Sequence, residues 1–316
     1  MPGPGEFEII RDYFSAAPQG EGVALGIGDD CALLQPPPQG LLATSVDTLV
    51  ADRHFPADAD AGLIATRALR VNLSDLAAMN ARPLWFTLAL TLPESDPDWL
   101  RAFADGLLQT AREYDISLVG GDTTRGPLSI TVQVIGTAQR PLRRDGAGIG
   151  DGIYVSGPLG AAAAALPLVL NRGAADSGDR QRAEQAYYRP QPQLQTAAAI
   201  GGIASAAVDI SDGLLADLGH ICRASGLSAE VRMESVPVAT LARRLAGDGA
   251  LELAATGGDD YQLCFTVPER RASALEALAT GAVRIGTLVA AGEEPAVYPR
   301  LRGEPWRARI PGYRHF

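Results

Sequence analysis

Six aspartates share a local context that suggests chemistry. Five are expected at a strand end or a glycine turn and one inside a helix; the six are Asp30, Asp47, Asp75, Asp122, Asp209 and Asp212. Loops at strand ends are where α/β proteins place ligands, and glycine lets backbone N–H groups approach an anion closely. Carboxylates in that setting favour Mg²⁺, which shares its remaining positions with water and substrate phosphates. The pattern predicts phosphoryl transfer, which depends mainly on positioning and on neutralising negative charge.

Each of these aspartates also has a purely structural interpretation. Aspartate is a preferred helix N-cap and turn residue, and for any one of the six this is the simpler explanation. The repetition of one context over six positions favours the metal-binding hypothesis instead.

The basic residues are all arginine: the 316-residue chain has 27 of them and no lysine. A Walker-A phosphate loop and a Schiff-base enzyme both need a lysine, so both classes are excluded. Metal and arginine would then have to neutralise any bound phosphate. The 37 acidic residues bring the formal net charge to -10, which argues against a nucleic-acid partner.

Cysteine and histidine usage also limits the function. Cys31, Cys222 and Cys264 are odd in number and widely spaced, which predicts free thiols and a reducing, cytoplasmic location. The N-terminus lacks a signal-peptide pattern and no run reaches the roughly 18 apolar residues of a membrane span, so no membrane association is expected. With only three histidines, a multi-histidine zinc site is not expected.

Short strands alternate with long helices in the first half of the chain. β-rich apolar runs predict strands at 41–46, 85–92 and 129–137, and a helix is predicted over roughly 61–79. A second helix begins at Asp96-Pro97, where an N-cap precedes a proline. Its apolar face is expected to contain Trp99, Phe103, Leu107 and Ala111.

A basic, glycine-rich stretch at 139–152 breaks this periodicity. It predicts a boundary between an N-terminal domain, residues 1–140, and a C-terminal α/β domain, residues 150–316. The strand 153–156 then leads through a glycine turn into an alanine-rich helix. Residues 171–193 are expected to form an exposed loop or a short helix.

The rest of the second half predicts two further strand–helix pairs. One strand ends at Asp209 and is followed by a helix from Gly213; the other covers 261–267 and is followed by a helix from about Pro268.

Two short motifs repeat at the same offset along the chain. Asn72–Asp75 resembles Asp209–Asp212, and Gly120–Asp122 resembles Gly257–Asp259. A shared offset would fit two related halves that present carboxylates at corresponding turns, while short motifs also coincide by chance.

Seven sequence blocks, in chain order, resemble the thiamine-monophosphate kinase family of the aminoimidazole ribonucleotide synthetase-like superfamily. They are GIGDDCALL, SVDTLVADRHF, NLSDLAAMNARP, GGDTTRGPLSI, DISDGLLADLGHI, GGDDYQLCFTV and the terminal GYRHF. A single GGD or SD motif is weak evidence, whereas seven ordered blocks are highly specific.

This resemblance implies both a fold and a reaction. The implied fold is of the α/β (α+β) class, with an N-terminal sheet-and-helix domain that pairs into a barrel in a homodimer and a C-terminal α/β domain. The implied reaction is the ATP-dependent phosphorylation of thiamine monophosphate to thiamine diphosphate by direct transfer. Several Mg²⁺ ions are the implied cofactors, and the nucleotide is expected near the dimer interface.

The family's binding positions carry over residue by residue. The implied metal-binding positions are Asp30, Ser45, Val46, Asp47, Asp75, Asp122, Asp209 and Asp212. The implied nucleotide-binding positions are Gly121, Asp122, Arg144 and Ser211. The positions implied to hold the thiamine phosphate are His54, Asp259 and Tyr313. No catalytic residue is implied beyond the metal ligands.

Two positions depart from the family pattern. Val46 replaces the usual threonine, so a metal contact there would have to use the main-chain carbonyl. Asp259 replaces the usual glutamate, so its substrate contact is expected to shift slightly or to gain a water.

Four of the nominated or neighbouring residues have simpler interpretations. His54 would fit an ordinary loop histidine, Arg144 a solvated arginine and Tyr313 a packing anchor for the tail. Trp306 is interpreted as structural.

Two alternative functions are weighed against this one. The first is another ATP-dependent enzyme of the superfamily. An enzyme similar to aminoimidazole ribonucleotide synthetase is disfavoured by the HF and GYRHF blocks, and one similar to selenophosphate synthetase is disfavoured because the N-terminal region lacks a reactive Cys-Gly or selenocysteine motif. A non-catalytic acidic module would be expected to carry EF-hand spacing or a charge run, and the sequence has neither.

Overall fold

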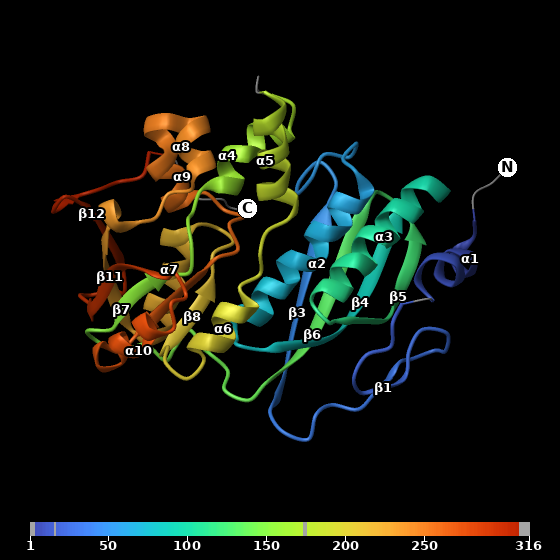
Figure 1. The fold of residues 1–316 in the computed structure, drawn as a ribbon, viewed down its shortest axis with the longest axis horizontal. Coiled ribbons are helices and arrows are strands. Elements are labelled where there is room, and N and C mark those ends of the chain that lie inside the picture. Colours follow the sequence, from blue (N-terminus) through green and yellow to red (C-terminus); the bar gives the residue numbers. More distant parts are fainter. Residues whose placement is uncertain (1–3, 16, 173–175, 310–316) are drawn as a thin grey trace. The chain divides into compact units, whose positions relative to one another are not determined.

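The structure, a computed structural model, describes residues 4–15, 17–172 and 176–309. The chain divides into two compact units. Unit 1 comprises Met1–Leu76 and Ala81–Gln139, and unit 2 comprises Ala77–Asn80 and Arg140–Phe316. Figure 1 shows the ribbon of both units, with many of the strands and helices labelled.

Unit 1 is built on a four-stranded sheet in the order β3-β6-β4-β5. The strands are β3 (Leu41–Val50), β4 (Arg82–Leu92), β5 (Ser117–Arg125) and β6 (Ser129–Ala138). β6 pairs antiparallel with β3 and β4, whereas β4 and β5 are parallel. The three strands predicted in this half are confirmed. The sequence pattern does not predict β5, because two glycines interrupt its apolar run.

Two of the six aspartates lie inside strands rather than at strand ends or turns. β3 continues beyond residue 46, so Asp47 pairs with Val132 within the ladder. Asp122 lies inside β5 opposite Ala89 of β4. The expected strand end at Asp47 and the expected glycine turn before Asp122 are therefore wrong. Pairing with a neighbouring strand outweighs the low strand preference of aspartate and glycine.

Helices α2 (Ala61–Ala78) and α3 (Pro97–Glu113) confirm the two helices predicted in this half. The side chain of Asp96 caps α3 by accepting hydrogen bonds from the backbone N–H groups of Asp98 (2.9 Å) and Trp99 (3.4 Å). On the predicted apolar face, the ring of Trp99 stacks on Phe103 with centroids 5.0 Å apart. The cap and the apolar spacing therefore specify α3 locally.

The two helices lie side by side in Figure 1 and approach closely at a pair of glycines. A Cβ atom added at Gly106 of α3 would lie 2.4 Å from the carbonyl oxygen of Gly62 in α2. Because the atoms that this Cβ would meet are backbone atoms of Gly62, any side chain at Gly106 has to push the helices apart.

Replacing Gly106 with alanine is expected to lower the free energy of unfolding by about 1–3 kcal/mol, the usual cost of overpacking a tight contact. Thermal denaturation followed by circular dichroism measures the change. The control is Gly292→Ala, because a Cβ atom at Gly292 has nothing within 4 Å. Equal melting temperatures for the two variants would contradict the close approach.

A two-stranded sheet completes unit 1. It pairs β1 (Val23–Leu25) with β2 (Leu33–Leu34), and its connection contains Asp30. The indole N–H of Trp85 donates a 2.8 Å hydrogen bond to the carbonyl of Glu21 just before β1. The short helix α1 (Glu6–Ile9) and a π-helical turn (Ile10–Phe14) precede these strands.

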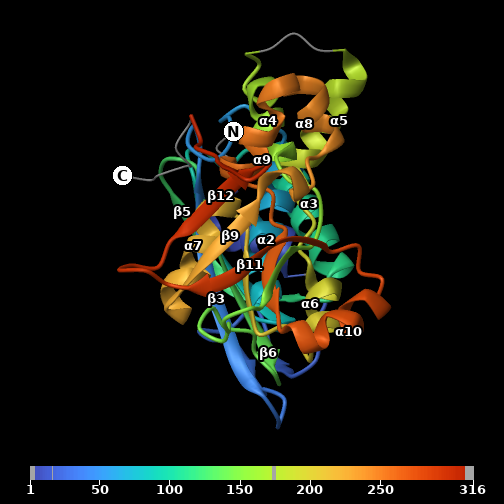
Figure 2. The same cartoon turned by 90° about the vertical axis from the view of Figure 1, so that its left-hand side faces the viewer.

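Unit 2 contains a seven-stranded sheet in the order β13-β12-β9-β11-β7-β10-β8. Its strands are β7 (Gly152–Val155), β8 (Ala206–Asp209), β9 (Leu227–Arg232), β10 (Leu263–Val267), β11 (Val283–Ala290), β12 (Val297–Leu301) and β13 (Glu304–Pro305). Figure 2 shows β12, β9 and β11 side by side. All neighbouring pairs are antiparallel except β9 and β12. The predicted strands 153–156 and 261–267 and the predicted strand end at Asp209 are confirmed by β7, β10 and β8.

Seven helices accompany this sheet in the described part of unit 2. They are α4 (Ala161–Val169), α5 (Ser177–Tyr188), α6 (Leu194–Ile200), α7 (Leu214–Ser225), α8 (Thr240–Ala246), α9 (Ala250–Thr256) and α10 (Ala272–Ala277). Single 3-10 turns cover Met233–Ser235, Gly247–Gly249 and Glu269–Arg271. The region predicted as an exposed loop or short helix contains α5, and Tyr187 and Tyr188 at its end are buried.

The repeated motifs occupy different structures in the two halves. Asn72–Asp75 lies within α2, whereas Asp209–Asp212 spans the end of β8 and the turn before α7. Gly120–Asp122 lies within β5, whereas Gly257–Asp259 forms a loop after α9. The carboxylates of the two copies therefore do not lie at corresponding turns.

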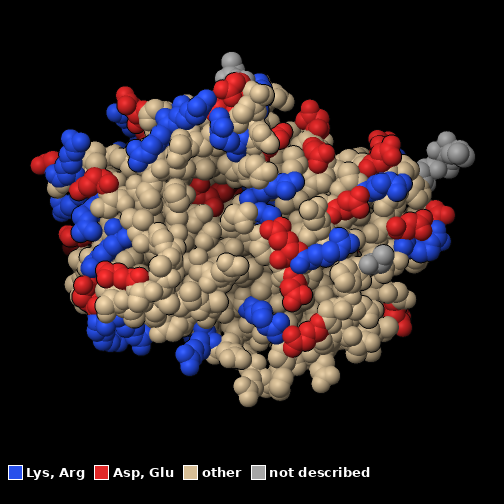
Figure 3. Space-filling model, viewed as in Figure 1, with Lys and Arg blue, Asp and Glu red and all other residues tan. Residues whose placement is uncertain are grey.

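The surface and the cysteines complete the description. Arginines and acidic side chains are interspersed over the face in Figure 3. Cys31 is exposed, Cys222 and Cys264 are buried, and all three are free thiols, as predicted. None of the helices in the described ranges combines the length and apolarity that crossing a bilayer requires.

Candidate active site

Ser45, Asp47 and Asp75 form the first group of predicted site residues, at the contact between β3 and α2. The Ser45 hydroxyl donates a 2.6 Å hydrogen bond to Oδ2 of Asp75. The backbone N–H of Asp47 donates to the side-chain oxygen of Asn72, one helical turn before Asp75. Burial and the negative charge of Asp75 raise the pKa of Asp47 to about 6. Two carboxylates whose negative charges repel each other in a half-buried site are suited to binding a cation.

Val46 lies between Ser45 and Asp47 on β3, and its side chain is 58% exposed. Successive side chains of a strand point to opposite faces, so the Val46 side chain points away from Ser45 and Asp47. Any contact with a metal shared by those two residues would have to come from the Val46 main chain.

Asp30, Gly121 and Asp122 form the second group, because all three line one cavity of about 580 Å³ in unit 1. Cys31 and Asp29 line the same cavity, and Asp29 accepts the backbone N–H of Asp30 at 2.8 Å. A Cβ atom at Gly121 would lie 1.9 Å from the carbonyl oxygen of Leu88 on the paired strand, so only glycine fits there.

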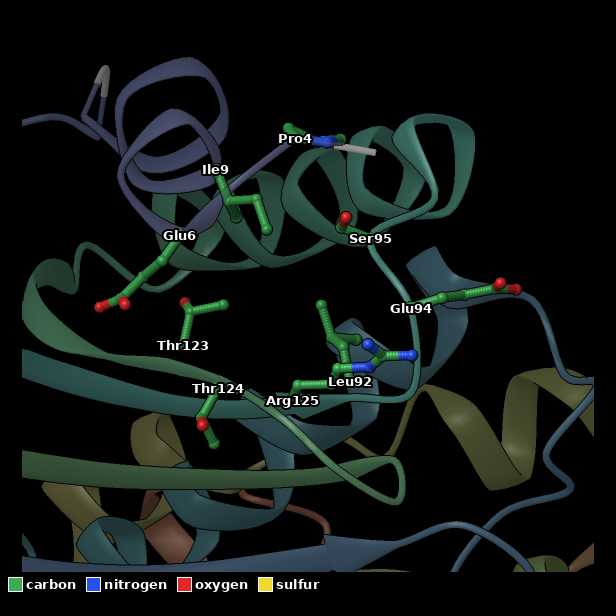
Figure 4. Close-up of a pocket in the computed structure, with 9 residues that line it drawn as sticks. All are labelled: Pro4, Glu6, Ile9, Leu92, Glu94, Ser95, Thr123, Thr124 and Arg125. Atoms are coloured by element: carbon green, nitrogen blue, oxygen red, sulfur yellow. The ribbon is translucent and has the colours of Figure 1, made fainter. Parts of the chain in front are cut away.

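A second cavity of about 540 Å³ lies beside the end of β5 and is shown in Figure 4. It contains Glu6, Glu94 and Arg125, and it shares Thr123 with the first cavity. The Nε atom of Arg125 donates to the carbonyl of Pro93 at 3.2 Å. None of the predicted site residues that the structure describes lines this cavity.

His54 lies in the tight turn that follows β3. Its Nδ1 atom accepts the backbone N–H of Val50 at 3.0 Å, and the backbone N–H of His54 donates to the Val50 carbonyl at 2.9 Å. An accepting Nδ1 places the proton of the neutral ring on Nε2, which makes Nε2 a hydrogen-bond donor. The ring is half-buried and held by its own turn, so it is not a freely moving surface histidine.

The third group, Asp209, Ser211 and Asp212, lies in unit 2 where β8 leads into α7. Oδ2 of Asp217, in the first turn of α7, accepts the backbone N–H groups of Ser211, Asp212 and Gly213 at 3.0, 3.1 and 3.1 Å. Burial raises the pKa of Asp217 to about 6, although these N–H groups act in the opposite direction. Asp217 therefore determines the conformation of the turn.

The loop that contains Asp259 is hydrogen-bonded to this same turn. The N–H of Asp259 donates to the carbonyl of Ser211, and the N–H of Tyr261 donates to that of Ile210, both at 2.8 Å. The Tyr261 hydroxyl donates to the Asp259 carboxylate at 3.1 Å. The structure thus brings predicted metal-, nucleotide- and substrate-binding residues of unit 2 together.

Asp260 connects that loop to α4. Its carboxylate accepts the backbone N–H groups of Gly160 at 2.6 Å and Ala161 at 3.1 Å, so it caps a helix whose own N-cap glycine has no side chain. Burial raises the pKa of Asp260 to about 7, against the effect of these N–H groups.

The raised pKa of Asp260 predicts a pH dependence of stability. The folded state binds the proton more tightly than the unfolded state, whose pKa is near 3.8, so the contribution of Asp260 is fully present below about pH 4 and is lost as the pH rises through about 7. The unfolding free energy of the wild type is expected to fall over this range, relative to Asp260→Asn, by at most about 1.4 kcal/mol per pH unit. Urea denaturation from pH 4 to 8 measures this, and parallel curves for the two proteins would contradict it.

Arg144 lies at the start of unit 2 in an ordered segment. Its carbonyl accepts the hydroxyl of Ser225 at the end of α7 at 2.8 Å, and its side chain is exposed. The neighbouring Arg143 is paired with Asp145, with 2.9 Å between Nε and Oδ1. The pKa of His220 on α7 is lowered by burial and by the positive charges of Arg144 and Arg223.

The C-terminal segment is described only in part. Tyr313 lies outside the described residues. Trp306 packs against the core of unit 2, and its backbone N–H donates to the carbonyl of Pro299 at 2.8 Å, which confirms its structural interpretation.

The predicted residues thus form separate groups within each unit. Over residues 4–15, 17–172 and 176–309, no three or more His, Cys, Asp and Glu side chains are arranged to hold a metal ion. Sequence reasoning missed Asn72, Asp217 and Asp260, although all three lie within the quoted blocks. For Asn72 the available signal is its helical spacing of three residues from Asp75.

Comparison with known proteins relates this geometry to a family. The N-terminal domain of AIR synthase related proteins matches residues 28–138, and the C-terminal domain matches residues 148–298. The thiamine-monophosphate kinase of Salmonella typhimurium is 50% identical over 277 residues, or 86% of this chain and 85% of the relative. The chain therefore belongs to the AIR synthase related proteins and, within them, to the thiamine-monophosphate kinase family.

Solved structures agree with this assignment. The crystal structure of thiamine-monophosphate kinase from Stenotrophomonas maltophilia superposes with a TM-score of 0.82 at 43% identity, covering 94% of this chain and 95% of the other. The structure of AaThiL complexed with AMPPCP and TMP superposes with a TM-score of 0.79 at 30% identity, covering 92% of both chains. The two-domain fold expected from the sequence blocks is confirmed.

Proposed function

We propose that this chain transfers the terminal phosphate of ATP to thiamine monophosphate, which forms thiamine diphosphate and ADP. The observation that carries the proposal is the similarity over 92% of the chain to AaThiL, whose structure holds AMPPCP and TMP together. The name of the 50% identical relative supports the same reaction over those of other superfamily enzymes.

In this reaction a phosphate oxygen of thiamine monophosphate attacks the γ-phosphorus of ATP. A new P–O bond forms, the bond from the γ-phosphorus to the bridging oxygen breaks, and ADP leaves with that electron pair. The attacking oxygen is already ionised at neutral pH, so no general base has to remove a proton. The main requirement on the protein is to hold two anions in line and to reduce their repulsion.

Magnesium is the cation that fits the donor set. Every predicted ligand offers oxygen. Burial and the charge of Asp75 raise the pKa of Asp47, and a bound cation would relieve the repulsion between the two carboxylates. When bound, Mg²⁺ neutralises phosphate charge and orients the transferred group. The residues proposed to hold the ions are Asp30, Ser45, Val46, Asp47, Asp75, Asp122, Asp209 and Asp212.

The remaining nominated residues bind the organic substrates. In a chain without lysine, Arg144 is the cationic side chain proposed for the ATP phosphates. The other residues proposed to bind the nucleotide are Ser211, Asp122 and Gly121. For thiamine monophosphate, His54 offers its Nε2–H group as a donor to the phosphate. Asp259 and Tyr313 are proposed to complete the recognition of that substrate.

A homodimer is also proposed, formed through the sheet of unit 1. β3 is an edge strand of that sheet, and it exposes Leu41 (66%) and Leu42 (56%) as well as Val46. An unpaired strand edge with exposed apolar side chains favours association with a second copy. The free thiols and the use of ATP support a cytoplasmic location.

Asp75→Asn is expected to lower kcat by at least roughly 100-fold, because it removes one charge of a cation-binding pair. Asparagine can still accept the Ser45 hydroxyl, so the melting temperature should change little. ADP release is measured with thiamine monophosphate, thiamine and an aminoimidazole ribonucleotide precursor as acceptors, over a series of Mg²⁺ concentrations. The wild type should respond steeply to Mg²⁺ and use only thiamine monophosphate.

The control for this variant is Asp105→Asn, which removes an exposed helical carboxylate from α3. It should behave like the wild type. Near-normal turnover in Asp75→Asn would contradict the proposed metal site, whereas activity with an aminoimidazole acceptor would favour the alternative superfamily reaction.

Leu42→Arg is expected to convert a dimer to monomers, since it places a charge among the exposed apolar side chains of β3. Sedimentation velocity measures the change. Ile149→Arg is the control, because Ile149 is equally apolar and 69% exposed but lies in unit 2. A Leu42→Arg protein with the mass of a dimer would exclude β3 as the interface.

A further inference from the structure

Asp217 receives an unusual concentration of backbone donors. One of its carboxylate oxygens accepts three consecutive N–H groups, those of Ser211, Asp212 and Gly213, at 3.0 to 3.1 Å. Three N–H groups that converge on one point form the kind of concavity that binds anions. Here a side chain of the protein itself occupies it. Asp217 is 3% exposed, and a buried carboxylate is retained only where such donors satisfy it.

The carbonyl groups of the same turn hold the loop at 257–261. Ile210 and Ser211 accept the N–H groups of Tyr261 and Asp259 at 2.8 Å. A Cβ atom at Gly258 would lie 2.4 Å from the Ser211 carbonyl, so the loop backbone lies directly against the turn. The position of the turn therefore determines the position of the loop.

The loop depends on these contacts for its conformation. Asp259 and Tyr261 have φ angles of +69° and +50°, in the left-handed region that non-glycine residues occupy at a conformational cost. Such backbone persists where surrounding contacts hold it in place. Loosening the turn is therefore expected to release Asp259 as well.

The side chain of Asp260 anchors the loop to a different element. It accepts N–H groups at the start of α4, from Gly160 and Ala161. The residues on both sides of Asp260 thus bond to the turn, and Asp260 itself bonds to a helix. The two buried carboxylates hold one loop from two directions.

We infer that Asp217 is a positioning residue that fixes Asp212 and Asp259 relative to each other. Asp217 therefore determines both the half-saturating Mg²⁺ concentration and KM for thiamine monophosphate. Asp260 determines only KM for thiamine monophosphate. The inference rests on the proposed function for the roles of Asp212 and Asp259. It extends that function to two residues that are not among the proposed metal or substrate ligands.

Steady-state kinetics of the full-length chain test this inference. Asp217→Ala removes the acceptor and should raise both the half-saturating Mg²⁺ concentration and KM for thiamine monophosphate by roughly 10-fold or more, as loss of a residue that orients metal ligands does. Asp217→Asn keeps an acceptor oxygen and should restore part of both values. Asp260→Asn should raise KM for thiamine monophosphate and leave the Mg²⁺ dependence unchanged.

A merely structural role predicts a different result. It would lower kcat in proportion to the folded fraction and leave both half-saturation values as in the wild type, which would overturn the inference. The matched control is Asp151→Asn, another buried aspartate of unit 2 that accepts a backbone N–H, from Gly148 at 2.9 Å. It should lower stability without changing either half-saturation value.

Hydrogen exchange supplies a readout that does not depend on turnover. In Asp217→Asn, amide exchange in peptides covering 257–262 should accelerate by roughly 10-fold or more, because local opening becomes more frequent. In Asp151→Asn it should match the wild type. Unchanged exchange in Asp217→Asn would overturn the inference, and this comparison also decides it if Asp217→Ala does not fold.

The proposed function and the positioning role of Asp217 are refuted by different results. A wild-type protein that releases no ADP with thiamine monophosphate and Mg²⁺ would refute the proposed function. An active wild type whose Asp217 variants keep wild-type half-saturation values and exchange would leave the function intact and refute the positioning role.

Discussion

The hydrogen bond from a backbone N–H group to a buried carboxylate is the interaction on which the site residues of unit 2 depend. Removing a carboxylate from water is costly, and only convergent donors make it tolerable. Asp217 collects three such donors from the turn after β8, and Asp260 collects those at the start of α4. Because each acceptor has one position that satisfies its donors, the turn and the loop around Asp259 adopt one arrangement.

Unit 1 brings two carboxylates close to each other. Burial and the neighbouring charge of Asp75 raise the pKa of Asp47, and the Ser45 hydroxyl donates a hydrogen bond to Asp75. The arrangement places two like charges close together, a repulsion that a bound cation would relieve. It suits a reaction in which two phosphates must meet in a chain with a net charge of -10 and no lysine. The same residue type thus positions the backbone in unit 2 and is proposed to bind a cation in unit 1.

The secondary structure around the site could be predicted where a local rule applied. The proline and N-cap at the start of α3 and its apolar spacing predict that helix, and β-rich runs predict β3, β4 and β6. The limits of β3 and the existence of β5 could not be predicted, because pairing with β6 and β4 overrides the turn preference of Asp47, Gly120 and Gly121. The internal repeat also misleads, because the surrounding chain places Asp75 in a helix and Asp212 in a turn.

Residue types and short spacings were sufficient to identify the chemistry: oxygen ligands, no lysine, and seven ordered blocks that resemble one kinase family. They indicate which residues carry functional groups that are able to bind a cation or a phosphate. The tertiary structure decided which of them meet. Ser45 and Asp75 are 30 residues apart, and Asp260 and Gly160 are 100 apart, yet each pair is joined by a hydrogen bond. Hydrogen bonds of this kind depend on the path of the whole chain, and no local pattern around Ser45 or Asp260 contains that path.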